Sequence, residues 1–141
     1  MLSGDLARHR DCIQANAMPP HDLILRTRAF ALAVFRFCRK LPRRDEVQET
    51  AKHLRDAANS TRSNYRAARK GRSRAEFQAK LQIAFEEADE CEDCLEFLRD
   101  AKIAHDPAPL QEAHEIASIL GSSVRTARKN TERLKKRRPD R

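Results

Sequence analysis

The sequence predicts an all-α protein built as an antiparallel up-down four-helix bundle. The 141 residues include only three Gly, six Pro and no Trp, while Ala, Leu, Glu, Arg and Lys dominate, which is typical of long packed helices. In four long segments, apolar residues recur at the spacing of one helix face. Short breaks separate these segments, and short connections favour antiparallel neighbours. A chain of this length is expected to form one domain with a modest core.

The two ends of the chain differ from its centre. Residues 1–21 show weak periodicity and end in MPPHD, so we expect a weakly structured N-terminal extension. The proline pair marks its boundary, because proline restricts its own backbone and that of the preceding residue. The sequence therefore assigns residues 22–135 to the bundle and residues 136–141 to a basic C-terminal tail.

The first two helices have clear start and stop signals. The first should begin near Asp22, a good N-terminal cap, and stop at Leu41 before a proline. Its apolar stripe is Phe30, Val34, Phe37 and Leu41. The second should run from Asp45 to Lys70, with Gly71 placed to end it in the left-handed backbone conformation. Its stripe is Val47, Ala51, Leu54, Ala58, Thr61, Tyr65 and Ala68.

The last two helices follow the same pattern. The third opens with SRAE, where Ser73 can cap the helix and Glu76 can reach back, a capping box. Its stripe is Phe77, Leu81, Ala84, Ala88, Cys91, Leu95 and Leu98. The sequence HDPAP, residues 105–109, then breaks the chain. The stripe of the fourth helix is Leu110, Ala113, Ala117, Leu120, Val124, Ala127, Thr131 and Leu134.

The third helix also carries apolar residues away from its main stripe. At about 100° per residue, a second face contains Ile83, Cys94, Phe97 and Ala101. A broad core face would explain them, but exposed apolar stripes on soluble proteins usually meet a partner. We favour a subunit interface in a homo-oligomer.

The charge of the chain is large and unevenly placed. With 29 Lys and Arg against 21 Asp and Glu, the net charge is +8, which favours anionic partners such as nucleic acid. Residues 22–72 carry fourteen basic and five acidic side chains, whereas residues 73–106 carry four and ten, and residues 107–141 carry nine and four. The third helix is therefore acidic in a basic bundle. Part of the basic charge could simply face this helix or a neighbouring subunit.

Basic side chains gather on one side of the second helix. The stretch NSTRSNYRAARKGRSRAEF, residues 59–77, contains six basic residues and one acidic residue. Within an arc of about 60°, at about 100° per residue, lie Arg55, Arg62, Arg66 and Arg69. Guanidinium groups match phosphate, and along a helix they can follow a nucleic-acid backbone without reading bases. We favour anion binding over a merely solvated face. The candidate nucleic-acid-binding residues are Arg55, Arg62, Asn64, Arg66, Arg69, Lys70, Arg72 and Arg74. Tyr65 lies on the apolar stripe and is expected to pack in the core.

The stretch LRDAANSTRSNYRAARKGRSRAEFQAKLQIAFEEADE resembles the signature region of the four-helix-bundle family of 23S ribosomal RNA intervening-sequence proteins. The accessory variability determinant of diversity-generating retroelements is similar and belongs to the same group. The residues that match the family pattern are Leu54, Arg55, Ala57, Ser60, Ser63, Asn64, Ser73, Glu76, Phe77, Leu81, Ile83 and Ala84. Many members have Asn-Ile-x-Glu-Gly where this chain has Asn64-Tyr65-Arg66-Ala67-Ala68, so an acidic residue is missing and an arginine is gained. The resemblance covers about residues 22–135.

This resemblance implies a homopentamer of bundles, arranged as a barrel-like ring, with a basic surface that contacts RNA or DNA. It also implies a rival function, in which the ring is a protein-interaction scaffold that docks a reverse transcriptase or another enzyme. In a third interpretation the ring is chiefly structural, and its basic charge only complements the acidic helix.

The sequence shows no catalytic, cofactor or metal motif. Cys91 and Cys94 form a CxxC pair, but acidic neighbours would raise their pKa values, and a zinc site needs two further ligands. There is no Glu-x-x-His motif for a di-iron site and no Gly-rich phosphate loop. We therefore expect no enzymatic activity, no cofactor and no metal.

The sequence also predicts a cytoplasmic protein with no membrane partner. The longest apolar run, AFALAVF at residues 29–35, is too short to span a bilayer, and the N-terminus lacks the design of a signal peptide. The four cysteines should then be reduced thiols: Cys12, Cys38, Cys91 and Cys94.

Overall fold

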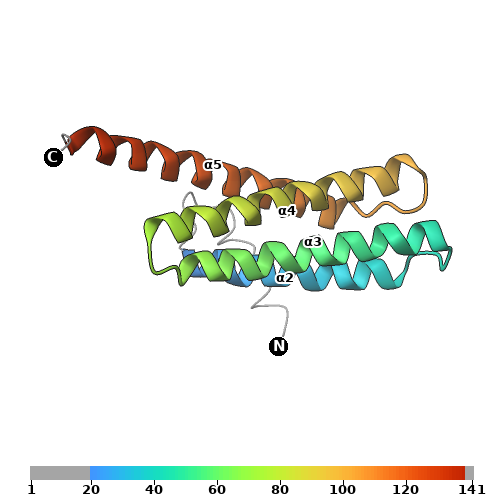
Figure 1. Ribbon diagram of the computed structural model, residues 1–141. Helices are drawn as coiled ribbons and strands as arrows, with labels where there is room; N and C mark the ends of the chain where they lie inside the picture. The colour runs from blue at the N-terminus through green and yellow to red at the C-terminus, as the bar shows by residue number, and fades with distance from the viewer. Residues whose placement is uncertain (1–19, 139–141) are drawn as a thin grey trace, which may run out of the picture.

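The computed structural model describes residues 20–138, which form four antiparallel α-helices and contain no strand (Figure 1). The helices are α2 (Pro20–Arg39), α3 (Asp45–Arg69), α4 (Arg74–Asp100) and α5 (Pro107–Arg137). The all-α prediction is therefore confirmed. Residues 1–19 of the expected extension lie outside the described residues.

The apolar stripes meet in one core. Its largest fully buried side chains come from all four helices: Phe30, Leu54, Leu81, Leu98, Ile116 and Leu120. The packing is most extensive between α3 and α4 and between α4 and α5, while α2 meets α5 at only a few residues. Helix α5 is the longest and continues past the turn between α3 and α4 (Figure 1). The apolar stripe expected on α5 therefore ends outside the core, where Leu134 is 43% exposed.

Several helix boundaries differ from those expected: α2 ends at Arg39 rather than Leu41, and α3 ends at Arg69 rather than Lys70. Helix α2 begins at Pro20 rather than near Asp22, and proline is favoured at the first helical positions because its missing N–H is not needed there. Helix α5 ends at Arg137 and so extends into the range assigned to the tail. The break lies earlier than the expected residues 105–109, because α4 ends at Asp100 and α5 already begins at Pro107. Asp106 caps α5 by accepting a hydrogen bond from the backbone N–H of Ala108 at 3.1 Å.

The turn between α3 and α4 uses glycine for a different reason from the one predicted. Gly71 does not have a positive φ, so the expected left-handed cap is wrong. A Cβ at this position would lie 3.1 Å from the Ala68 carbonyl oxygen and 3.2 Å from the Phe77 backbone nitrogen. Gly71 therefore serves the close approach of two backbone segments.

The predicted capping box at the start of α4 forms in part. The Ser73 hydroxyl oxygen accepts a hydrogen bond from the Glu76 backbone N–H at 3.1 Å, as expected. The Glu76 carboxylate does not bond the backbone of Ser73, and instead accepts from the backbone N–H of Arg72 at 3.0 Å. The carboxylate therefore stabilises the turn one residue earlier than a capping box would.

The weak contact between α2 and α5 is held by a charged cluster. The Arg26 guanidinium donates to Glu112 and Glu115, and its Nη2 lies 3.1 Å from Glu112 Oε2. Burial alone would lower the pKa of Arg26, but the two carboxylates outweigh that effect and raise it. This side chain is thereby committed to the fold and contributes no free charge to the surface.

Candidate nucleic-acid interface

The arginine row of α3 consists of Arg55, Arg62, Arg66 and Arg69, and it lies on the side of α3 nearest α2. Arg55 lines a hollow together with α2 residues, which fixes the direction of the row. Arg66 and Arg69 are exposed, whereas Arg55 and Arg62 are partly buried. The opposite edge of α3 faces the acidic helix, because His53 pairs there with Glu90 of α4.

No ion pair joins a carboxylate to the arginine row within residues 20–138. The carboxyl of Asp56 has its pKa lowered chiefly by a hydrogen bond from Lys52, and the charge of Arg55 adds to that effect. The basic partners of the ion pairs in this part of the chain are Arg26, Lys52, His53, Arg99 and His114. Arg62 instead donates through Nε to the Asn59 side-chain oxygen at 3.2 Å, a neutral partner that leaves its charge unbalanced. Acidic side chains of α4 turn to other neighbours, as Glu92 does in pairing with His114 at 2.7 Å.

Two residues near the row do not belong to it. Asn64 lies about 160° around α3 from Arg62 and Arg66, at about 100° per residue. Its amide nitrogen donates to the Ser60 carbonyl and hydroxyl oxygens, at 2.9 Å each. Its assignment to the same surface is therefore corrected. Tyr65 is buried in the core, as its position on the stripe predicts.

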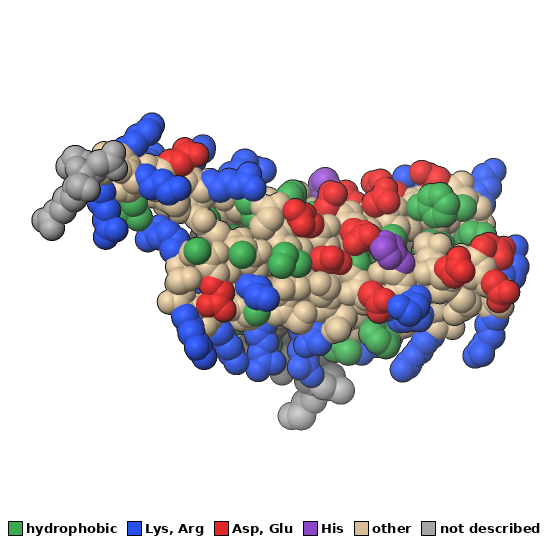
Figure 2. Space-filling model, viewed as in Figure 1, with side chains coloured by type: hydrophobic (Ala, Val, Ile, Leu, Met, Phe, Trp, Pro, Cys, Tyr) green, Lys and Arg blue, Asp and Glu red, His purple; other side chains and the backbone are tan. Residues whose placement is uncertain are grey.

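The basic surface continues around the end of the bundle. Lys70, Arg72 and Arg74 are exposed at the turn between α3 and α4. Arg74 lines a shallow hollow with Lys135 and Arg138, so the turn and the end of α5 are neighbours. Figure 2 shows Lys and Arg side chains along the lower edge and the left end of this face, with acidic side chains gathered toward its upper right. The charge segregation of the sequence is thus a segregation in space.

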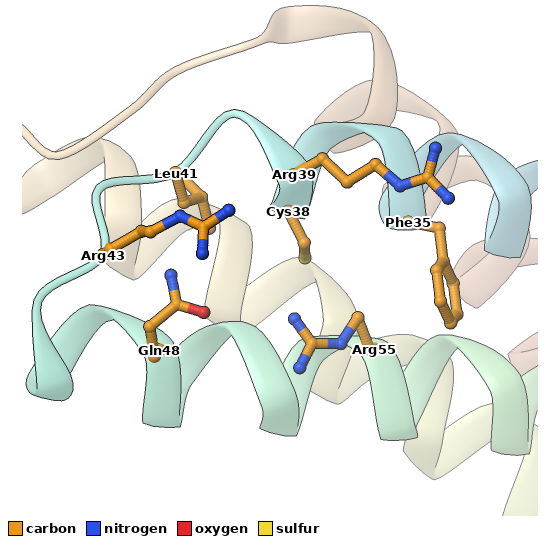
Figure 3. Close-up of a pocket in the computed structure, with 7 residues that line it drawn as sticks. All are labelled: Phe35, Cys38, Arg39, Leu41, Arg43, Gln48 and Arg55. Atoms are coloured by element: carbon orange, nitrogen blue, oxygen red, sulfur yellow. The ribbon is translucent and has the colours of Figure 1, made fainter.

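A hollow of about 690 Å³ lies where α2 and α3 approach the connection between them. It is lined by Phe35, Cys38, Arg39, Leu41, Arg43, Gln48 and Arg55. Figure 3 shows that the Arg55 side chain points back toward Cys38, while Arg39 extends along α2 toward the side of Phe35. The lining includes three guanidinium groups and no carboxylate.

Besides Leu134 of α5, large apolar side chains among residues 20–138 reach the surface at two places, on α4 and on α2. On α4, Phe97 is 61% and Ile83 37% exposed, and Ala101 is exposed just after the helix. Cys94 is only 6% exposed and belongs to the core, so its assignment to the exposed second face is corrected.

The second place, on α2, was not predicted from the sequence. On α2, the exposed large apolar side chains are Leu25, Leu32 and Phe35. For Leu32 and Phe35 the signal was the run AFALAVF, because seven consecutive apolar residues point in every direction around a helix and some must face outward.

The three described cysteines are free and buried: Cys38, Cys91 and Cys94. Burial raises the pKa of all three thiols, and for Cys94, with help from Glu90 and Asp93, to about 11. The charge of nearby Arg55 partly offsets the effect of burial on Cys38. Cys12 lies outside the described residues.

These thiols should be unreactive in the folded protein. In a Cys12→Ser chain at about pH 8, we expect iodoacetamide to modify none of the three in buffer and all three in urea, as counted by mass spectrometry, because only the thiolate reacts. A thiol pKa raised by folding stabilises the protein below the unfolded value of 9.0, and this contribution is lost as pH rises toward 11. Urea midpoints should therefore fall over that range. Rapid labelling of Cys94 in buffer would contradict this account.

Within residues 20–138, no group of three or more His, Cys, Asp or Glu side chains is arranged to hold a metal ion. In the same range, no helix combines the length and the apolar character needed to cross a bilayer.

The fold and the surface together define a four-helix bundle with one strongly basic edge. The chain belongs to the 23S rRNA-intervening sequence protein family, whose model matches residues 21–126. It is also similar to a crystal structure of a protein of unknown function from the S23 ribosomal protein family of Bacteroides thetaiotaomicron VPI-5482. That likeness has 25% sequence identity and a TM-score of 0.69, and covers 77% of this chain and 99% of the other. No curated protein matches the chain significantly.

Proposed function

We propose that this protein is a non-enzymatic nucleic-acid-binding oligomer that holds RNA or DNA by its phosphate backbone. The observation that carries the proposal is the arginine row of α3, which forms no ion pair with a carboxylate within residues 20–138. An exposed guanidinium without a carboxylate keeps its capacity to bind phosphate, often through two hydrogen bonds.

The dimensions of the row suit a polyanion. From Arg55 to Arg69 the helix rises about 21 Å, at about 1.5 Å per residue. One nucleic-acid strand presents a phosphate about every 3.4 Å of helix axis, so the row passes about six of them. Lys70, Arg72 and Arg74 extend the same path around the turn toward the basic end of α5. Binding of this kind positions the backbone and does not read the bases.

The oligomer is proposed from the exposed apolar residues of α4. Phe97, Ile83 and Ala101 form a surface that would lose water on contact with a second copy. The family resemblance suggests a pentameric ring. Such a ring would repeat the arginine row on each protomer and so increase the avidity for a long polyanion.

A protein-docking scaffold remains the second candidate. The observation that favours it is the exposed apolar group on α2, Leu25, Leu32 and Phe35, which is separate from the proposed subunit interface on α4. The partner in this account would be an enzyme such as a reverse transcriptase.

Light scattering coupled to gel filtration tests the main proposal. With a mixed RNA pool at about 50 mM salt, we expect a particle heavier than the free oligomer. At about 500 mM salt the protein and the RNA should separate, because binding releases counterions from the phosphates and this release is less favourable at high salt. The mass of the free particle reports the number of subunits. A particle that never takes up RNA, DNA or heparin at low salt would favour the scaffold.

A further inference from the structure

We infer that the hollow between α2 and α3, lined by Phe35, Arg39, Arg43 and Arg55, is a site for one unpaired nucleotide of a single-stranded nucleic acid. The base would stack on the Phe35 ring, and its phosphate would be held by the arginines. This inference rests on the proposed function, and adds to it a preference for single strands over duplexes.

The first argument is the aromatic ring. Phe35 is 45% exposed although the adjacent lining residues Cys38 and Leu41 are buried, so the ring stands at the wall of the hollow with an apolar floor beside it. Aromatic rings exposed among basic residues are the stacking platforms of single-strand-binding proteins, because every base has a π-face. Phe35 is well placed for this, since Arg39 extends toward its side of the hollow (Figure 3).

The second argument is the charge of the lining. Three guanidinium groups and no carboxylate border this space, and none of the three forms an ion pair within residues 20–138. Gln48 is fixed there by a hydrogen bond from its amide nitrogen to the Pro42 carbonyl oxygen at 2.9 Å. Positive charge that borders a concave apolar surface fits a ligand with an anionic and an aromatic part. A nucleotide has both.

The third argument is continuity and size. Arg55 belongs both to the hollow and to the arginine row, so a strand that follows the row arrives at the hollow. A hollow of about 690 Å³ lies within the range of small-ligand pockets, about 300–1,000 Å³, which accommodates one nucleotide. A duplex keeps its bases stacked on each other, whereas the bases of a single strand can turn outward onto a protein ring.

The test compares Phe35→Leu with Phe97→Leu, which removes an exposed aromatic ring at the proposed subunit interface and should therefore change single-strand and duplex affinity by the same factor. Fluorescence anisotropy would measure the affinity of each variant for a 20-nucleotide RNA, single-stranded or in a duplex. We expect Phe35→Leu to weaken single-strand binding roughly 5- to 150-fold, the range for losing one stacked base, and to leave duplex binding within about twofold. Phe35→Tyr should restore single-strand affinity, because its ring stacks equally well.

Three outcomes would overturn the inference. Phe35→Leu could leave single-strand binding unchanged, or weaken both substrates equally, or change the mass of the particle in light scattering, in which case Phe35 is a subunit contact. In these outcomes wild-type protein still binds RNA, so the proposed function stands. If the wild-type protein binds neither substrate, the proposed function fails and the inference fails with it.

Discussion

Replacing Arg62, Arg66 and Arg69 together by Glu is expected to abolish the retention of RNA and DNA while the helices remain intact. Each replacement removes a phosphate contact and places a repelling charge in its position. Because a charge-assisted hydrogen bond contributes about 1.5–3 kcal/mol, three reversals should weaken binding by at least about 1,000-fold at low salt. Fluorescence anisotropy would measure the affinity, and circular dichroism the helix content.

A matched control separates the site from the net charge. Lys80, Arg99 and Lys102 lie on α4 or just after it, and replacing these three by Glu changes the net charge of the chain by the same amount. We expect that control to lose far less affinity, because its positions lie outside the arginine row. Equal losses in the two triple variants would show that binding follows overall charge alone.

The second large effect concerns the core. Leu54 is fully buried in the middle of α3, the helix that presents the arginine row. Leu54→Ala should lower the free energy of unfolding by about 2–5 kcal/mol, through lost apolar burial and the cavity left behind. Urea unfolding followed by circular dichroism would measure this loss.

The control for Leu54 is the same substitution at an exposed leucine. Leu134 is 43% exposed near the end of α5, so Leu134→Ala should change the free energy of unfolding by no more than about 0.5 kcal/mol. A loss of less than about 1 kcal/mol from Leu54→Ala would mean that α3 is not packed as described.

The helix stripes were predictable because periodicity reports burial directly. Residues predicted to lie on one face of α3, such as Ala51, Leu54 and Ala58, are fully buried. The ends of helices were harder to predict, because backbone geometry there depends on neighbouring segments. Gly71 is an example. A glycine is needed there because the backbones of Ala68 and Phe77 lie too close for a larger residue, and no local sequence pattern reveals this.

The end of α4 shows the same limit. Lys102 adopts a positive φ of 58°, the conformation that sequence reasoning reserves for glycine. The backbone N–H of Ile103 donates to the Leu98 carbonyl at 3.0 Å and that of Lys102 to the Arg99 carbonyl at 2.9 Å. These bonds and the packing of Ile103 on the core fix the conformation, and neither is visible in the residue types.

The arginine row could be read from the sequence, because four arginines at helical spacing share a side of α3 wherever the helix packs. The identity of the neighbouring helix could not be read in the same way. Only the packing shows that α2 borders the row, and that Arg39 and Arg43 of another segment join Arg55 around one hollow. Asn64 was wrongly assigned to the surface of the arginine row because it is close to these arginines in sequence, although it lies on another side of the helix.

The most direct measurement of the central claim is the salt dependence of binding to single-stranded RNA. Wild-type protein would be compared with a neutral variant carrying Arg62→Gln, Arg66→Gln and Arg69→Gln. Each phosphate contact adds about 0.7 to the slope of log affinity against log salt, so the slope should be smaller by about 2 in the variant. Equal slopes for the two proteins would contradict the account, because these three guanidinium groups would then touch no phosphate.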